Sequence, residues 1–130
     1  MGRVNLLHEE LSYKIRGILY TTHNYLGCYR NEKIYCDAIE RGLSVKGLNY
    51  EREFILPITF VGEKEGRNRL DFLVENTIIV EVKVVPILSK NVYHQCLRYL
   101  VSSNKELLIL VNFYPQNLFI KRILNPNLLK

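Results

Sequence analysis

The chain has 130 residues, of which 48% are hydrophobic and 24% are charged. This composition is typical of an ordinary globular protein and argues against intrinsic disorder. The length predicts a single domain over residues 1–130 that can bury a substantial core. Because 18 Lys and Arg residues exceed 13 Asp and Glu residues, the net charge of +5 favours a polyanionic partner, although mere solubility would also account for it.

No apolar run approaches the roughly 18 to 20 residues that a transmembrane helix needs. His8, Glu9 and Glu10 interrupt the N-terminal segment, which therefore lacks the apolar region of a secretory signal peptide. We expect a cytoplasmic protein with no membrane partner. The three cysteines are odd in number and lack CxxC spacing, which predicts reduced thiols instead of a disulfide framework or a zinc knuckle.

Two helices are predicted in the N-terminal third of the chain. Apolar residues recur at helical spacing from about residue 4 to residue 20, at Val4, Leu7, Leu11, Ile15 and Ile18. A connection is expected from Thr21 to Asn31, and Asn31 is a suitable N-cap for a second helix from about Glu32 to Lys46. The helix macrodipole favours a carboxylate at Glu32 whatever else that residue does. The buried stripe of this helix is predicted at Tyr35, Ile39 and Leu43.

The other elements outside the centre of the chain are predicted from side chains that alternate between two faces of a strand and from runs of apolar residues. Residues 49–57 predict a strand near a sheet edge, with Tyr50, Arg52, Phe54 and Leu56 on one side. The expected elements that follow it are a short strand from Ile58 to Val61, a loop from Gly62 to Asn68, a helix from Ser89 to Ser103, a doubly buried strand from Leu107 to Val111, a strand from Phe119 to Ile123 and a loosely held tail from Asn125 to Lys130. The order of these helices and strands along the chain predicts an α/β (α+β) fold with a mixed central β-sheet flanked by helices.

The central stretch is predicted to form a β-hairpin, with strands from Arg69 to Val74 and from Thr77 to Val84 joined at Glu75-Asn76. Alternation places Leu70, Phe72 and Val74 on one side of the first strand and Asp71 on the other. In the second strand Glu81 and Lys83 share a side. A two-residue turn would set Asp71 across from Val80, so that an extra loop residue or a bulge is needed to bring Asp71 opposite Glu81.

Two carboxylates beside a lysine suit a hard divalent cation. Mg²⁺ keeps several waters, so one or two protein carboxylates can hold it beside a substrate phosphate. The metal can then activate a water and neutralise charge on the phosphate, while Lys83 stabilises the same charge or orients the water. The alternative is an edge strand whose charged side chains simply face solvent, and for an isolated Glu-x-Lys pair that alternative is the commoner outcome.

The order Glu32, Asp71, Glu81-Val82-Lys83 and Gln95 resembles the PD-(D/E)XK nuclease superfamily. Within it, residues 26–35, Leu-Gly-Cys-Tyr-Arg-Asn-Glu-Lys-Ile-Tyr, are similar to the signature of the bacterial and archaeal GxxExxY proteins. Two positions depart from these patterns, since Tyr29 stands where the signature has its glycine and Leu70 where the superfamily name has proline.

The resemblance implies a restriction-endonuclease-like αβββαβ core and a metal-dependent nuclease. Asp71 and Glu81 would bind Mg²⁺, or Mn²⁺ in its place, and Glu32 would complete or orient the metal shell. Lys83 would assist at the phosphate, and Gln95 would lie beside the site from the third helix. The matching Tyr35 is as readily explained by the core as by the site.

Several functions remain open at this stage. The first is a nuclease acting on DNA or RNA, with phosphate contacts predicted from Arg67, Arg69, Arg98 and Lys121. The second is a catalytically silent module on the same scaffold that binds nucleic acid or protein. A homodimer or protein partner suits either, because the short chain has little room for a separate DNA-reading domain. Only the enzyme needs a cation for chemistry, whereas a binder holds nucleic acid without it. A small-molecule enzyme that uses the carboxylates as acid and base is the least supported.

Overall fold

A computed structural model describes residues 7–129. Its elements in chain order are α1 (Glu9–Leu26), α2 (Glu32–Val45), β1 (Tyr50–Ile55), β2 (Arg69–Val74), β3 (Ile78–Lys83), α3 (Lys90–Ser103), β4 (Leu107–Asn112), β5 (Phe119–Leu124) and the short 3-10 helix η1 (Pro126–Leu129). The predicted order of elements and the mixed α/β class are confirmed. Within the described residues, no helix is long and apolar enough to cross a lipid bilayer.

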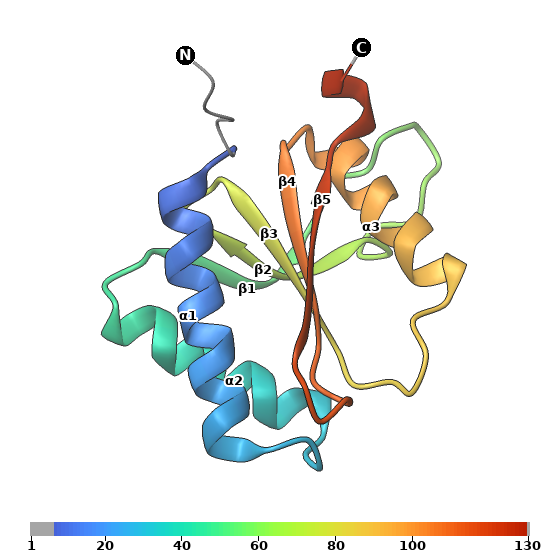
Figure 1. The fold of residues 1–130 in the computed structure, drawn as a ribbon. Coiled ribbons are helices and arrows are strands. Elements are labelled where there is room, and N and C mark those ends of the chain that lie inside the picture. The colour runs from blue at the N-terminus through green and yellow to red at the C-terminus, as the bar shows by residue number, and fades with distance from the viewer. Residues whose placement is uncertain (1–6, 130) are drawn as a thin grey trace.

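The described strands form one sheet in the order β1-β2-β3-β4-β5 (Figure 1). Neighbouring strands are antiparallel, except that β3 and β4 are parallel. A parallel pair needs a crossover connection, and α3 provides it by passing over one face of the sheet. The central strand β3 therefore has α3 at its C-terminal end, which brings a helix close to Glu81 and Lys83.

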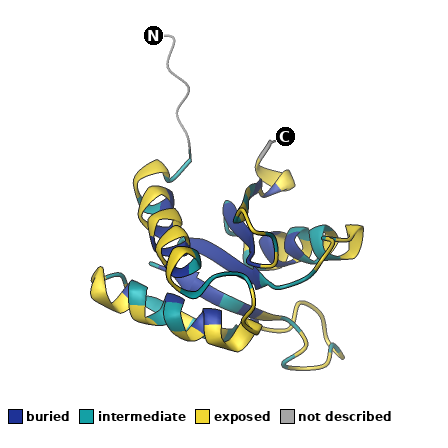
Figure 2. Ribbon diagram, turned by 60° about the horizontal axis from the view of Figure 1, so that its bottom comes forward, coloured by how far each residue is buried: buried dark blue, intermediate teal, exposed yellow. Residues whose placement is uncertain are grey.

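Helices cover both faces of the sheet, as Figures 1 and 2 show. Under α1 and α2 lies one apolar cluster, which includes Ile15, Leu19, Ile39, Phe72, Val80 and Ile109. Under α3 lies a second, which includes Leu70, Ile79, Cys96, Leu100 and Leu108. Because helices pack on both sides, every residue of β4 is buried, as its run of apolar residues predicts.

Helix α1 extends well beyond its predicted end. The connection predicted from Thr21 to Asn31 is wrong over its first half, because the helix continues to Leu26. Thr22 is buried and its hydroxyl donates to the Ile18 carbonyl, so this polar residue extends the apolar stripe. Gly27 then ends the helix with a φ of 76°. The predicted start at Val4 lies outside the described residues.

Two further predictions outside the site are wrong. Residues 58–61 belong to a loop that spans residues 56–68 and form no strand, and Val61 is fully exposed. The C-terminal tail is also held more firmly than predicted. Asn125 is buried and its amide donates to the carbonyls of Leu100 and Lys105, which fastens the start of η1 to the end of α3.

β2 and β3 form the predicted hairpin, but the loop is one residue longer than a two-residue turn. Phe72 pairs with Val80, so the register brings Asp71 and Glu81 opposite each other. The loop comprises residues 75–77, and its first two residues each have a φ of 51°. The extra loop residue that the sequence required is therefore present.

The side chains of β1 and β2 change faces near Glu53. Arg52 pairs with Phe72 and Phe54 pairs with Leu70. Phe72 packs toward α2, whereas Phe54 and Leu70 pack in the cluster under α3. The prediction that Leu70 shares a face with Phe72, and Phe54 with Arg52, is therefore wrong. Glu53 has a left-handed backbone with a φ of 54°, which turns the strand over at this point.

Candidate active site

The site forms where β2 and β3 stop pairing through their backbones. Just past the last paired residues, the Asp71 N–H donates to Glu81 Oε2 at 2.8 Å. The Val82 N–H donates in turn to Asp71 Oδ2, also at 2.8 Å. The two carboxyl groups thus take the place of the backbone carbonyls as hydrogen-bond acceptors between the strands. The alternative of an edge strand with solvated charges is wrong, because β3 lies inside the sheet and Glu81 is 2% exposed.

Burial strongly perturbs both carboxyl groups. Burial first, and the neighbouring Asp71 carboxylate second, raise the pKa of Glu81 to about 8. Burial also raises the pKa of Asp71, against the opposing effects of the Val82 N–H, Lys83 and Arg52. Near neutral pH the pair therefore retains a proton that two solvated carboxylates would have lost.

Lys83 and Gln95 border the carboxylates from β3 and α3. Lys83 is two residues after Glu81 and points to the same side of the strand. Its ammonium group donates to Gln95 Oε1 at 3.4 Å, and it lowers the pKa of both carboxyl groups. The structure thus places Gln95 beside the site from the third helix, where the sequence predicted it.

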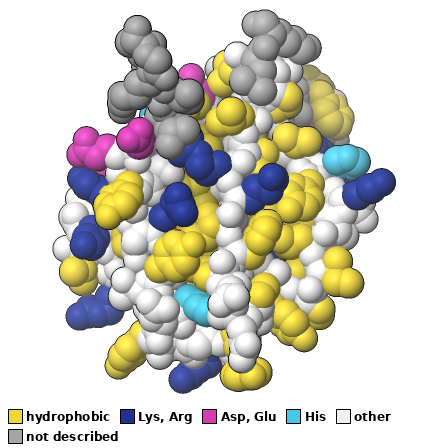
Figure 3. All heavy atoms as spheres, in the orientation of Figure 1, with side chains coloured by type: hydrophobic (Ala, Val, Ile, Leu, Met, Phe, Trp, Pro, Cys, Tyr) yellow, Lys and Arg dark blue, Asp and Glu magenta, His cyan; other side chains and the backbone are white. Residues whose placement is uncertain are grey.

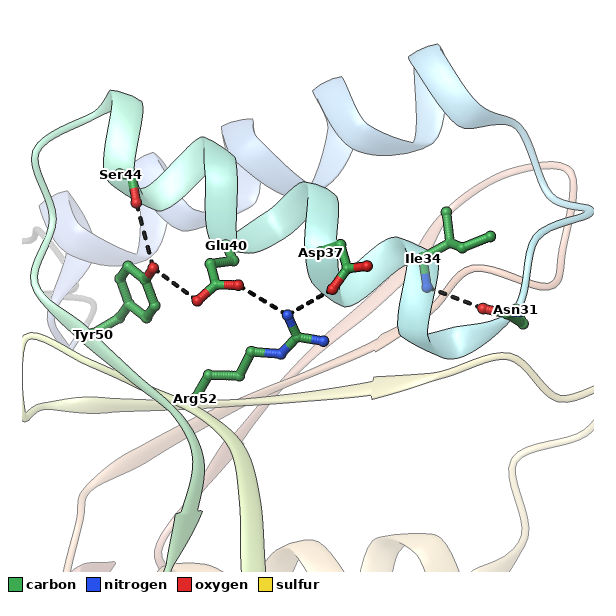
Figure 4. A network of polar contacts seen from close by, with 7 residues as sticks. All are labelled: Asn31, Ile34, Asp37, Glu40, Ser44, Tyr50 and Arg52. Carbon is green, nitrogen blue, oxygen red and sulfur yellow. Dashed lines mark hydrogen bonds and ion pairs between the residues drawn. The ribbon is translucent and has the colours of Figure 1, made fainter.

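Glu32 approaches the pair from the first turn of α2. Asn31 caps this helix, as predicted, because its side chain accepts a hydrogen bond from the Ile34 N–H at 3.0 Å (Figure 4). Partial desolvation by the surrounding protein, and second the Asp71 carboxylate, raise the pKa of Glu32, while Lys83 lowers it. Glu32 is therefore within electrostatic range of the pair, and it lies on the solvent side because its own side chain is exposed.

Tyr35 is a core residue that holds the segment before Glu32. Its ring is fully buried and stacks on Phe113, with centroids 4.2 Å apart and planes at 12°. Its hydroxyl donates to the Gly27 carbonyl at 2.6 Å and accepts from the Arg30 N–H at 3.2 Å. Tyr35 therefore positions the segment that leads into Glu32 instead of contacting a ligand.

Arg52 fastens β1 to α2, and sequence reasoning missed this contact. Its Nη1 donates to Asp37 at 2.7 Å and to Glu40 at 2.9 Å, while the Tyr50 hydroxyl donates to Glu40 at 2.9 Å (Figure 4). These bonds fix α2 over the sheet and so fix where Glu32 stands relative to Asp71. The corresponding signal in the sequence is a cation at Arg52, on the side of a predicted strand that otherwise carries Tyr50, Phe54 and Leu56.

Two buried thiols lie close to the pair. Cys36, on α2, is within electrostatic range of Asp71, and Cys96, on α3, is within range of Glu81. Burial raises the pKa of each thiol to about 12, so both are protonated and behave as small apolar groups. They contribute to the desolvation of the carboxylates. All three cysteines are free, as predicted.

Comparison with known proteins identifies the family. No curated protein and no solved structure matches the chain. A family model described as the PD-(D/E)XK nuclease superfamily matches residues 9–123. The chain belongs to the PD-(D/E)XK nuclease superfamily. The predicted superfamily is confirmed, whereas the narrower GxxExxY assignment stays a prediction.

PD-(D/E)XK nucleases generally use divalent metal ions, and the carboxylate pair fits such an ion. Each carboxylate uses one oxygen for a backbone N–H, and the other oxygens, Asp71 Oδ1 and Glu81 Oε1, have no hydrogen-bond donor among residues 7–129. In that same range, no three His, Cys, Asp or Glu side chains form a ready metal site. Two carboxylates suffice for Mg²⁺, which keeps several waters. Direct ligation by Glu32 stays a prediction.

The cations predicted to contact phosphate do not form one patch. Arg67 lies in the loop before β2, and Arg69, the first residue of β2, is paired with Glu53 at 3.0 Å. Arg98 is on α3, and Lys121 is on β5 at the opposite edge of the sheet from β1. All four are exposed. Their contact with nucleic acid stays a prediction.

The perturbed carboxyl pair predicts an unusual pH dependence of stability in the absence of metal. Because the pKa of Glu81 is about 8 when folded and 4.5 when solvated, the unfolded chain loses its proton first as pH rises. The free energy of unfolding should therefore fall between about pH 4.5 and pH 8. Glu81→Gln removes this loss, so at pH 8.5 the variant should be more stable by at least about 1.4 kcal/mol, the equivalent of one pKa unit.

Urea denaturation in EDTA at pH 4.5, 6.5 and 8.5 measures this difference. The two proteins should have similar stability at pH 4.5 and diverge as pH rises. Parallel pH profiles for wild type and Glu81→Gln would show that Glu81 is not held in the protonated form.

Tyr35→Phe tests the positioning role of the hydroxyl. The variant keeps the stack on Phe113 but loses the bonds to Gly27 and Arg30, which should cost about 1 kcal/mol of stability. Amide exchange should accelerate in residues 27–31 and stay unchanged in β4. Tyr35→Leu serves as the comparison, because it also removes the stack. Unchanged exchange in residues 27–31 of Tyr35→Phe would contradict this role.

Proposed function

We propose that the chain is a metal-dependent nuclease that hydrolyses phosphodiester bonds in DNA or RNA at the Asp71–Glu81 pair. One observation carries the proposal. The buried Glu81 carboxylate and the half-buried Asp71 carboxylate each accept a backbone N–H from the other's strand, and among residues 7–129 neither has a donor for its second oxygen. The Lys83 ammonium lies within electrostatic range of both. Membership of a nuclease superfamily supports the same chemistry.

Asp71 and Glu81 would hold Mg²⁺ or Mn²⁺, and Glu32 would complete or orient that shell from α2. The bound ion supplies charge neutralisation at the phosphate and a water of lowered pKa. Lys83 offers a second positive charge to the phosphate as negative charge develops on its oxygens. The bond from Lys83 to Gln95 limits the freedom of a long side chain, so less conformational entropy is lost when substrate binds.

The burial of the pair accounts for much of its expected strength. Interactions between charges are stronger in a dry site than in water, and both carboxylates are already aligned before substrate arrives. Arg69 remains a candidate for phosphate contact despite its bond to Glu53, because an exposed ion pair is worth at most about 1 kcal/mol and a phosphate can replace it.

Cleavage of labelled DNA and RNA in Mg²⁺ or Mn²⁺ tests the proposal. Wild type should cleave, EDTA should stop cleavage, and Glu81→Ala and Lys83→Ala should each lower the rate at least about 100-fold. Matched controls are Glu51→Ala, an exposed carboxylate on β1, and Lys105→Ala, which contacts Asn76 in the hairpin loop at the other end of β3. Both controls should cleave at the wild-type rate.

The result that contradicts the proposal is specific. If wild type cleaves no substrate with either cation but binds nucleic acid equally well in EDTA, the chain acts as the silent binding module instead.

A further inference from the structure

Tyrosine side chains are exposed along α1 and in the segment that follows it. Tyr13 is 78% exposed, Tyr20 42%, Tyr25 88% and Tyr29 90%. Tyr35, the next tyrosine in the chain, is fully buried and fills the core. The exposed rings therefore make a small contribution to the fold and leave large flat surfaces in contact with water.

Three of these rings, Tyr13, Tyr20 and Tyr25, border a groove between α1 and α2. Two hollows of about 480 and 500 Å³ share Thr21 and Lys46 in their linings and are therefore continuous. Gly42 lets the helices approach closely, since a Cβ atom there would lie 2.6 Å from Ile18 Cγ2. We call the surface formed by the following residues the α1–α2 face: Tyr13, Lys14, Arg16, Tyr20, Tyr25, Arg41 and Lys46.

The α1–α2 face is cationic. The described residues that line the two hollows include four Lys or Arg side chains and no Asp or Glu. The acidic residues Asp37 and Glu40 of α2 are turned toward β1, where Arg52 binds them. In the view of Figure 3, which faces α1, β5 and α3, Lys and Arg side chains lie among hydrophobic ones and Asp and Glu lie near the N-terminal end of α1. The charge of the face therefore suits a polyanion.

The face leads toward the candidate active site. Tyr13 and Lys46 line the hollow at the end of the groove formed by the start of α1 and the end of α2. Tyr25 lies near the other end, and Tyr29 follows it, three residues before Glu32. The chain passes from the groove to Glu32 within a few residues, and Glu32 is within electrostatic range of Asp71.

We infer that the α1–α2 face binds single-stranded nucleic acid, with tyrosine rings stacked on unpaired bases and Lys and Arg side chains on phosphates. A surface that combines exposed rings with cations matches this ligand, because every base has a flat face and every nucleotide carries one charge. A duplex would use the cations but would offer its bases no access to the rings. Single-stranded nucleic acid would then be the substrate class of the proposed nuclease. Binding at this face does not require that function; only the path of the bound nucleic acid toward Glu32 rests on it.

Binding without cleavage tests the inference. The measurement is fluorescence anisotropy of a labelled 12-nucleotide single strand and of the matching duplex, with the full chain in EDTA. Tyr13→Ala and Tyr25→Ala should each weaken single-strand binding about five- to tenfold, whereas Tyr13→Phe and Tyr25→Phe should change it less than twofold. Phe60→Ala removes an exposed ring from the loop at residues 56–68 and should have no effect. Lys14→Gln should weaken binding and reduce the slope of log affinity against log salt concentration by about one.

Two results would overturn the inference. The first is single-strand affinity that Tyr13→Ala and Tyr25→Ala leave unchanged. The second is a dimer, seen by sedimentation, that these substitutions dissociate while affinity stays the same, because the face would then bind a second copy. Failure of the proposed nuclease is separate: an inactive chain whose single-strand binding depends on the tyrosines supports this inference alone, and an active chain whose binding ignores them supports the nuclease alone.

Discussion

The arrangement of the site depends on the exchange of hydrogen bonds between Asp71 and Glu81 where β2 and β3 part. Each carboxylate accepts a backbone N–H that would otherwise lose its interstrand partner. A buried N–H without a partner is costly, so the strands can separate here only because the side chains replace the missing carbonyls. The same bonds fix both carboxylates close together with little freedom. The loop at residues 75–77 is part of this arrangement, because its extra residue sets the register that makes the pair face each other.

The surrounding elements have separate roles in this site. Helix α2 brings Glu32, and the bonds of Arg52 and Tyr35 hold the helix and the segment before it. Helix α3 brings Gln95 to Lys83 and covers the pair from the other face. The price of this packing is the burial of two like charges, which raises both pKa values. A bound cation would offset that cost. A pair of carboxyl groups destabilised by burial inside a sheet is therefore more consistent with a functional site than with one that stabilises the fold.

Much of the fold could be predicted from the sequence, because apolar periodicity and caps are local signals. Asn31 caps α2, and the apolar run in β4 is buried on both faces. The predictions that fail concern backbone geometry and side-chain hydrogen bonds that the pattern of apolar residues does not encode. No residue near Glu53 signals that β1 and β2 turn over, so simple alternation predicts the wrong face for Leu70. A polar residue such as Thr22 predicts a connection, because its hydroxyl finds its acceptor, the Ile18 carbonyl, only when the helix has formed. The candidate site residues are predicted from their order along the chain, whereas Arg52 and the hydroxyl of Tyr35 act through contacts that no spacing encodes.

The most direct test of the account is where a divalent cation binds. Crystals grown near pH 8 and soaked in MnCl₂ would locate Mn²⁺ by its anomalous scattering. The account predicts a peak between Asp71 and Glu81, about 2 Å from one oxygen of each carboxylate, with the two backbone hydrogen bonds retained. A fully occupied peak elsewhere, or a pair that stays unchanged in high Mn²⁺, would contradict the claim that these carboxylates form a metal centre.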